Sequence, residues 1–250
     1  MVRLDADGAI ASITLDRPDR RNALTPAMLD EVPNLVRRAE QAARVIVLRG
    51  EGQVFCAGFD LSLCRDDPTG ETMKSLLRGL SVAVRSLGRS RLPVVAAGHG
   101  AAIAGGCALL GGADFVITND EARLGYPVLR LGVSPAVSAP FLRAGVGDAA
   151  CRERLLDTGL ISGGEAARIG LAWRSLARPE AVLPAAMELA ERLAHKSAPA
   201  LAATKAWLNE IDGTGAAYWP DRALDASLGL AGGAEERAML PPAWGGGERG

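Results

Sequence analysis

The sequence predicts an α/β fold in which strands and helices alternate through the first half and helices alone follow. Three short apolar segments, residues 43–50, 93–100 and 113–120, have the length and composition of buried parallel strands. Helical or glycine-opened apolar stretches separate them, and this alternation is typical of parallel βαβ units with helices on both faces of the sheet. From about residue 136 onward we expect helices and no further strands.

The first elements can be assigned from local patterns. Residues 9–15 alternate with a period of two and end at a proline turn, which predicts a strand. Thr25 and Pro26 are typical of a helix N-cap followed by proline at the first helical position. Pro33 lies inside the helical pattern that follows, so we expect a kink or a late start there. A further helix is expected over residues 73–87.

The C-terminal third is expected to be helical. Residues 182–193 carry one amphipathic stripe of apolar side chains at helical spacing. The last residues, 243–250, are too rich in glycine to pack, so we expect a mobile tail. The helices expected in this part of the chain cover residues 141–144, 150–156, 164–169, 180–193, 199–208 and 216–230.

Composition narrows the class of protein. The 250 residues are enough for one large domain with a sizeable core, and the net charge of −1 with no long Lys/Arg cluster argues against nucleic-acid binding. The four cysteines form no regular framework, so we expect reduced, buried thiols in a cytoplasmic protein. No signal-peptide core and no run of roughly 18 apolar residues is present, so no membrane partner is expected.

Two loops are candidates for a ligand site. Residues 54–61 and 102–107 each follow a buried strand, and open α/β sheets bind ligands at the carboxyl ends of their strands. A backbone N–H from each loop could meet at one oxygen, and Gly105 would add the positive end of the following helix. Such an arrangement is an oxyanion hole. The alternative is that the glycines only allow a helix and a strand to pack closely, and these residues alone leave both open.

Five motifs carry a resemblance to a known family. They follow one another as RPDRRNAL (17–24), FCAGFDL (55–61), GHGAAIAGGCALLGGADF (98–115), GVSPAVSAPFLRAGVG (132–147) and LISGGEAARIGLAWR (160–174). In this order and spacing the chain resembles the crotonase (enoyl-CoA hydratase/isomerase) superfamily over about residues 1–210. The resemblance implies a ββα spiral core, which we place at residues 1–190, and an all-helical C-terminal region over 191–250. It also implies assembly into homotrimers or homohexamers.

The resemblance also implies a substrate class and a site. Members of this family bind acyl-CoA thioesters and stabilise an enolate through two backbone N–H groups, which correspond to Phe59 and Gly105. Coenzyme A would enter as part of the substrate, with no resident cofactor and no metal. The residues that correspond to the substrate-binding segments are Arg21, Ala23, Leu24, Ala57, Asp60 and Leu61.

Two departures from the family bear on catalysis. Family hydratases carry one glutamate where this chain has Ala108 and a second where it has Val128. Hydration of a double bond needs groups that position water and transfer protons, and neither alanine nor valine can do so. The segment 232–244 also differs from the basic, aromatic tail that often closes over coenzyme A in relatives. The sequence therefore predicts a thioester enzyme without the usual glutamate pair or, alternatively, an acyl-CoA-binding protein with little turnover.

Other side chains are weaker candidates for the chemistry. Asp60 is either a catalytic acid or a carboxylate that caps the next turn, and Tyr126 either faces the cavity or packs in the core. Ser134 and Ser138 lie where some relatives keep an acid or a nucleophile, and they can equally act as loop and helix caps. A thiol–imidazole pair of Cys107 with His99 is the remaining option.

Overall fold

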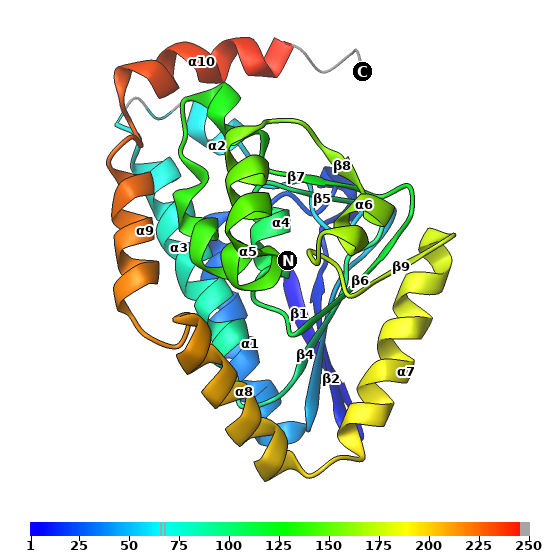
Figure 1. Ribbon diagram of the computed structural model, residues 1–250. Coiled ribbons are helices and arrows are strands. Elements are labelled where there is room, and N and C mark those ends of the chain that lie inside the picture. The colour runs from blue at the N-terminus through cyan, green and yellow to red at the C-terminus, as the bar shows by residue number, and fades with distance from the viewer. Residues whose placement is uncertain (66, 68, 246–250) are drawn as a thin grey trace.

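A computed structural model describes residues 1–65, 67 and 69–245, and the side chains up to residue 240. Its main feature is a six-stranded sheet with the strand order β1-β2-β3-β4-β6-β9 (Figure 1). A second, three-stranded sheet has the order β5-β7-β8. The strands are β1 (Val2–Asp7), β2 (Ile10–Leu15), β3 (Val45–Gly50), β4 (Val94–Ala97), β5 (Ala101–Ile103), β6 (Phe115–Asn119), β7 (Arg123–Gly125), β8 (Ile161–Ser162) and β9 (Arg174–Leu176).

The sheet is parallel except for its first hairpin. β1 pairs antiparallel with β2, whereas β2, β3, β4, β6 and β9 run parallel to their neighbours. Every residue of β4 is buried, and so are all but one in β3, as expected for strands covered on both faces. The predicted parallel sheet is therefore confirmed.

Helices cover both faces of the large sheet, as Figure 1 shows with α7 on one side and α1 and α3 on the other. Their apolar stripes form two core clusters, one on each face. Four short 3-10 helices accompany them: η1 (Pro18–Arg20), η2 (Pro127–Leu131), η3 (Pro135–Ser138) and η4 (Pro179–Ala181). The α-helices are α1 (Pro26–Ala42), α2 (Ser62–Arg65), α3 (Glu71–Arg89), α4 (Gly105–Leu110), α5 (Ala139–Leu156), α6 (Gly163–Arg168), α7 (Val182–Ala194), α8 (Ala198–Asp212), α9 (Tyr218–Leu228) and α10 (Ala234–Gly245).

Several expectations need correction. β8 and β9 lie beyond residue 136, so the expectation of no further strands is wrong; both are very short and are stabilised by pairing with β7 and β6. α1 begins at Pro26, with Thr25 Oγ1 accepting a hydrogen bond from Met28 N at 3.3 Å, and continues through Pro33, which excludes the late start. The two helices expected near 141–156 are present as the two halves of α5, which meet at Gly147, a residue with non-helical φ 77° and ψ 174°.

The C-terminal region is helical throughout its described part. α8, α9 and α10 follow α7, and a division near residue 190, which lies within α7, stays a prediction. Of the expected mobile tail, residues 243–245 belong to α10, and 246–250 lie outside the described residues. None of the described helices is long and apolar enough to cross a membrane. The four cysteines are free and buried, as predicted.

Candidate active site

The two predicted loops are neighbours in the structure. Residues 54–61 lie between the loop after η1 and strand β5, and a parallel bridge joins Leu24 to Phe59. In this bridge Leu24 N donates to Gly58 O at 2.7 Å, and Asp60 N donates to Leu24 O at 2.8 Å. A second bridge joins Cys56 to β5. The two predicted loops therefore lie side by side.

The backbone amides of Phe59 and Gly105 are both free. Leu24 bonds the residues on either side of Phe59, so the Phe59 N–H points away from Leu24. Gly105 opens α4, and the first N–H groups of a helix have no partner within it. Neither amide has a hydrogen-bond partner in the described part of the chain, and both residues line the same pocket. Two free donors at one cavity are what an oxyanion hole requires.

A strained residue precedes the second donor. Ala104 has φ 50° and ψ −111°, a conformation that a residue with a side chain rarely adopts. It is held there because Ala104 N donates to Gly125 O at 2.8 Å and Ala104 O accepts from Ala108 N at 2.9 Å. Strain of this kind persists where the surroundings fix it, often at functional sites. Here it turns the chain abruptly from β5 into α4 and sets the position of the Gly105 amide.

Gly105 and Gly106 differ in what an added side chain would contact. A Cβ atom on Gly106 would lie 2.6 Å from Cys56 O and 2.7 Å from Cys56 Cβ, so Gly106 allows close packing against the loop. A Cβ atom on Gly105 would instead lie 2.9 Å from Cε1 of the Phe59 ring, which lines the pocket. Both glycines thus allow close packing, Gly106 against main chain and Gly105 against a side chain, and the donor role of the Gly105 amide stays a prediction.

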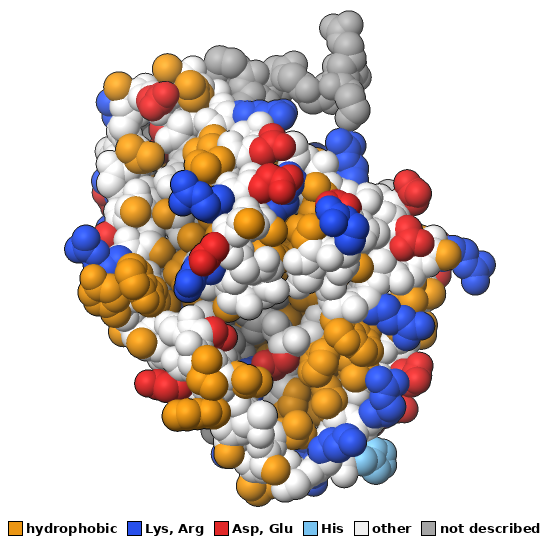
Figure 2. Space-filling model, viewed as in Figure 1, with side chains coloured by type: hydrophobic (Ala, Val, Ile, Leu, Met, Phe, Trp, Pro, Cys, Tyr) orange, Lys and Arg blue, Asp and Glu red, His pale blue; other side chains and the backbone are white. Residues whose placement is uncertain are grey.

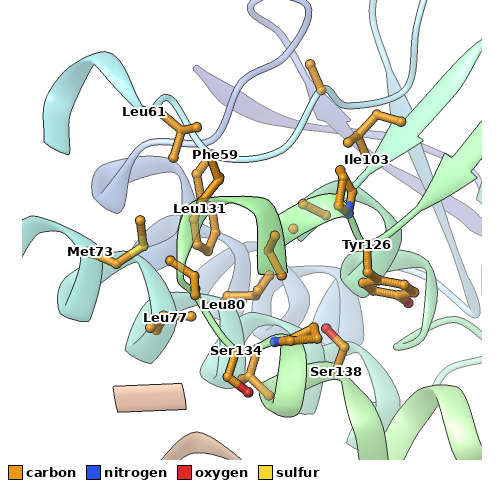
Figure 3. A pocket seen from close by; sticks show the side chains of 18 residues that line it. Phe59, Leu61, Met73, Leu77, Leu80, Ile103, Tyr126, Leu131, Ser134 and Ser138 are labelled. Atoms are coloured by element: carbon orange, nitrogen blue, oxygen red, sulfur yellow. The ribbon is translucent and has the colours of Figure 1, made fainter. Parts of the chain in front are cut away.

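The pocket beside these amides is small and apolar. Its volume is about 140 Å³, and Figure 3 shows side chains from α3, the 55–61 loop, η2 and η3 surrounding it. No Asp, Glu, Lys, Arg, His or Cys lines it within the described residues. Its lining residues are Ala57, Phe59, Leu61, Met73, Leu77, Leu80, Ile103, Ala104, Gly105, Tyr126, Pro127, Val128, Leu131, Val133, Ser134, Pro135, Val137 and Ser138.

The two positions predicted to lack the family's glutamates differ in surroundings. Val128 is half-buried in η2 and lines the pocket. Ala108 is 2% exposed within α4 and belongs to the core rather than to the lining. The lining contributed by Met73, Leu77 and Leu80 was not anticipated, although the strongly amphipathic pattern of α3 is the signal from which it follows.

Tyr126 lines the pocket, and its hydroxyl lies beside the Cys107 thiol. Burial raises the pKa of Tyr126 well above its ordinary value, and Cys107 adds to the shift. Burial likewise raises the pKa of Cys107 to about 11, so this thiol stays protonated near neutral pH. The His99 Nε2 atom contacts Gly52 O at 2.9 Å, and no bond joins His99 to Cys107. The structure thus gives no support to a thiol–imidazole pair.

Both carboxylate oxygens of Asp60 accept hydrogen bonds from neighbouring residues. Its Oδ2 atom accepts from the Arg17 guanidinium at 2.7 Å, and its Oδ1 atom accepts from Ser62 Oγ at 2.5 Å and Ser62 N at 3.2 Å. Burial by itself would raise the pKa of Asp60, but the bonds from Ser62 and Arg17 outweigh it and hold the pKa below its ordinary value. Asp60 is not among the pocket residues. These contacts favour the turn-capping interpretation.

The predicted substrate-binding segments are held by main-chain bonds. Ala57 N donates to Arg21 O at 2.9 Å, and Arg21 itself is exposed, with φ 52°. Ala23 is half-buried, whereas Leu24 is fully buried and offers a ligand no side-chain surface. Sequence reasoning missed Asn22, a buried residue in the left-handed region whose Nδ2 donates to the carbonyls of residues 51, 54 and 55. Asparagine tolerates the left-handed conformation better than most residues do, and this preference is the sequence feature from which the role of Asn22 could be predicted.

The two serines of the 134–138 segment differ. Ser134 Oγ accepts from Ala136 N at 3.2 Å and so caps η3. Ser138 makes no side-chain cap bond to α5, although its side chain lines the pocket. Within the described residues, no group of three or more His, Cys, Asp or Glu side chains could hold a metal ion.

Comparisons with known proteins find a matching family and sequence relatives. The family model described as enoyl-CoA hydratase/isomerase matches residues 5–215. The chain is 30% identical over 212 residues to the short-chain-enoyl-CoA hydratase of Clostridium acetobutylicum, covering 83% of this chain and 80% of that protein. It is 30% identical over 211 residues to the crotonyl-CoA hydratase of Syntrophomonas wolfei, with the same coverage of each.

Solved structures give the same result. An enoyl-CoA hydratase/isomerase from Mycobacterium paratuberculosis superimposes with a TM-score of 0.86 at 26% identity, covering 96% of this chain and 97% of that one. One from Xanthobacter autotrophicus gives a TM-score of 0.87, also at 26% identity, over 98% of this chain and 93% of that one. The fold class predicted from the motifs, a crotonase-type α/β core with a helical C-terminal region, is thereby confirmed. The chain belongs to the enoyl-CoA hydratase/isomerase family.

Proposed function

We propose that the protein processes acyl-CoA thioesters and stabilises a thioester enolate between the N–H groups of Phe59 and Gly105. The observation that carries the proposal is the pair of free amides at one apolar pocket. Charge that develops on the thioester oxygen would be held by two donors already in place, in surroundings where electrostatic interactions are strong. The loops around residues 20–24 and 57–61 would bind the coenzyme A portion, largely through backbone.

The reaction would differ from ordinary hydration. Ala108 and Val128 replace the family's glutamates, and no carboxylate, imidazole or ammonium group lines the described pocket. Each missing general acid or base lowers the rate by roughly 10²–10⁴. We therefore expect turnover of crotonyl-CoA far below the ~10 s⁻¹ of an ordinary enzyme. The same observation favours the second candidate function, an acyl-CoA-binding protein with little turnover.

Calorimetry with matched ligands tests the oxyanion hole. Butyryl-CoA carries the thioester oxygen, whereas the thioether S-butyl-CoA has none and fills a similar volume. Two added hydrogen bonds of ordinary strength correspond to roughly 5- to 100-fold in affinity, so butyryl-CoA should bind that much more tightly. Equal affinities would refute the oxyanion hole, and absence of binding by either ligand at millimolar concentration would refute the function. Crotonyl-CoA hydration at ~10 s⁻¹ or faster would refute the assignment of the missing acid and base.

We also propose that the chain assembles as a homotrimer or homohexamer in the cytoplasm. The free, buried thiols are consistent with a reducing compartment.

Large apolar side chains on α8 and α9 are exposed, and the face in Figure 2 carries hydrophobic side chains around a central hollow. Light scattering after size exclusion tests the assembly, and a monomer mass would refute it. The exposed side chains are Trp207, Leu208, Ile211, Tyr218 and Trp219.

A further inference from the structure

The pocket contains one serine hydroxyl that makes no hydrogen bond within the described part of the chain. Three of the lining side chains carry polar atoms: Tyr126, Ser134 and Ser138. The Tyr126 hydroxyl lies beside Cys107, and Ser134 Oγ accepts from Ala136 N. Ser138 Oγ has no hydrogen-bond partner in the described part of the chain, although Ser138 is only 5% exposed.

This hydroxyl is available to whatever fills the cavity. In Figure 3 Ser138 lies on the wall of the pocket below Tyr126, with its oxygen on the side of the cavity. Among the described side chains, the fully buried polar atoms without a partner are Thr14 Oγ1 and Arg49 Nε, so Ser138 Oγ is open to the cavity. A ligand that covered this hydroxyl without bonding to it would leave a buried polar group unpaired, which is unfavourable. A bound molecule with an oxygen at this point would satisfy it.

The surroundings restrict the kind of oxygen. Ser138 is the N-cap residue of α5, so the positive end of that helix favours an acceptor atom beside it. No Lys, Arg or His lines the described pocket, and a carboxylate would therefore be buried without a counter-charge. A neutral hydroxyl or ketone oxygen fits both conditions.

The volume restricts the size of the ligand. A dry cavity of about 150 Å³ lined by Leu, Ile and Phe side chains holds a benzene molecule, and this pocket measures about 140 Å³ with a similar lining. An acyl group of about six non-hydrogen atoms would fill it by the same comparison.

We propose that Ser138 is a specificity-determining residue whose hydroxyl donates a hydrogen bond to a neutral oxygen carried by a short acyl group. The inference rests on the proposed function, because it takes the acyl group of a CoA thioester as the occupant of the pocket. It adds a preference that the backbone amides alone do not impose, since these bind the thioester oxygen common to all such substrates.

A panel of CoA thioesters measured by calorimetry tests this. The probes are butyryl-CoA, its 3-hydroxy, 4-hydroxy and 3-oxo analogues, succinyl-CoA, hexanoyl-CoA and decanoyl-CoA. The wild-type protein should bind one of the neutral oxygenated thioesters about 3- to 10-fold more tightly than butyryl-CoA, and succinyl-CoA more weakly. Decanoyl-CoA should bind no more tightly than hexanoyl-CoA, because the added carbons exceed the cavity.

Two matched variants assign the preference to its residue. Ser138→Ala should lose the preference for the oxygenated thioester while binding butyryl-CoA as before, with an unchanged melting temperature because its hydroxyl has no protein partner. Ser134→Ala should keep the preference, since Ser134 is more exposed than Ser138 and its oxygen is held at the start of η3 by the bond that it accepts from Ala136 N. Retention of the preference in Ser138→Ala, or its absence in the wild-type protein, would overturn the inference while leaving acyl-CoA binding intact. Failure of every thioester to bind would instead count against the proposed function.

Discussion

Replacement of each glycine in the 105–106 pair by alanine should separate ligand binding from stability. In Gly105→Ala the new Cβ atom meets the edge of the Phe59 ring at 2.9 and 3.1 Å and a Leu24 methyl at 3.2 Å. The ring is only partly buried and can move, at about 0.5–1.5 kcal/mol for an off-rotamer position. Alanine recovers up to about 1 kcal/mol of helix propensity over glycine. The net change in stability should stay within about 1 kcal/mol.

Gly106→Ala meets main chain instead of a mobile ring. Its Cβ atom would lie 2.6 Å from Cys56 O, and that backbone is fixed because Cys56 N donates to Ala101 O and Cys56 O accepts from Ile103 N, each at 3.0 Å. Overpacking of this kind destabilises by about 1–3 kcal/mol. At roughly 2–4 °C per kcal/mol for a chain near this size, the melting temperature should fall by about 2–12 °C.

For ligand affinity the order should be reversed, with a loss in Gly105→Ala and none in Gly106→Ala. Gly105→Ala displaces Phe59, whose ring lines the pocket and whose amide is one proposed donor, so acyl-CoA should bind at least about 10-fold more weakly, the equivalent of 1.4 kcal/mol. Gly106→Ala should bind normally well below its melting temperature. Thermal melts and calorimetry on both variants measure this. Normal affinity together with a large loss of stability in Gly105→Ala would make Gly105 a packing glycine and refute the oxyanion hole.

Two carboxylates give further predictions. Asp60→Asn should lower the melting temperature by about 2–4 °C at pH 7, because the pair with Arg17 is partly exposed and contributes about 1 kcal/mol. The folded-state pKa of Asp60 is lowered, so this stability is present above the unfolded pKa of about 3.9 and is lost as pH falls through the folded value. Thermal melts at pH 7 and pH 3 measure this, and a difference in melting temperature from the wild-type protein that does not shrink at pH 3 would contradict it. Lys205→Met removes the cation that lies 2.7 Å from Asp114 Oδ2; the Lys205 side chain is buried but that of Asp114 is 27% exposed, so the loss should cost about 1.5–3 kcal/mol in denaturant titrations. A cost below about 1 kcal/mol would mean that Asp114 does not depend on its partner.

Local patterns predict the long elements of this fold and miss the short ones. The N-cap of α1 and the parallel strands β3, β4 and β6 follow from spacing and composition, because each buries enough apolar surface to carry a signal. β8 and β9 have two and three residues and no measurable period, so only pairing with β7 and β6 makes them strands. The kink of α5 at Gly147, with φ 77°, depends on a conformation that the residue type permits but does not require.

In the candidate site, too, some features can be predicted from the sequence and others cannot. The roles proposed for Phe59 and Gly105 could be predicted from motifs because they belong to the backbone and therefore to position in the chain. The state of Ser138 could not, since a hydroxyl without a partner is a property of everything packed around it. The same holds for Asp60: only the structure shows that Arg17 and Ser62 occupy its oxygens.

The departure from the family that the motifs predict lies in side chains, and the proposed chemistry follows from that. The proposed oxyanion hole is made of main-chain amides, which the residues at positions 108 and 128 do not alter directly. Ala108 still donates its N–H to Ala104 O, which helps to hold Gly105, and Val128 still lines the pocket from η2. Loss of the two carboxylates would thus leave enolate stabilisation in place and remove proton transfer by the protein. Any reaction in the described pocket would then draw its proton from solvent or from the substrate itself, and its rate should follow the acidity of the substrate more closely than the pKa of any lining side chain.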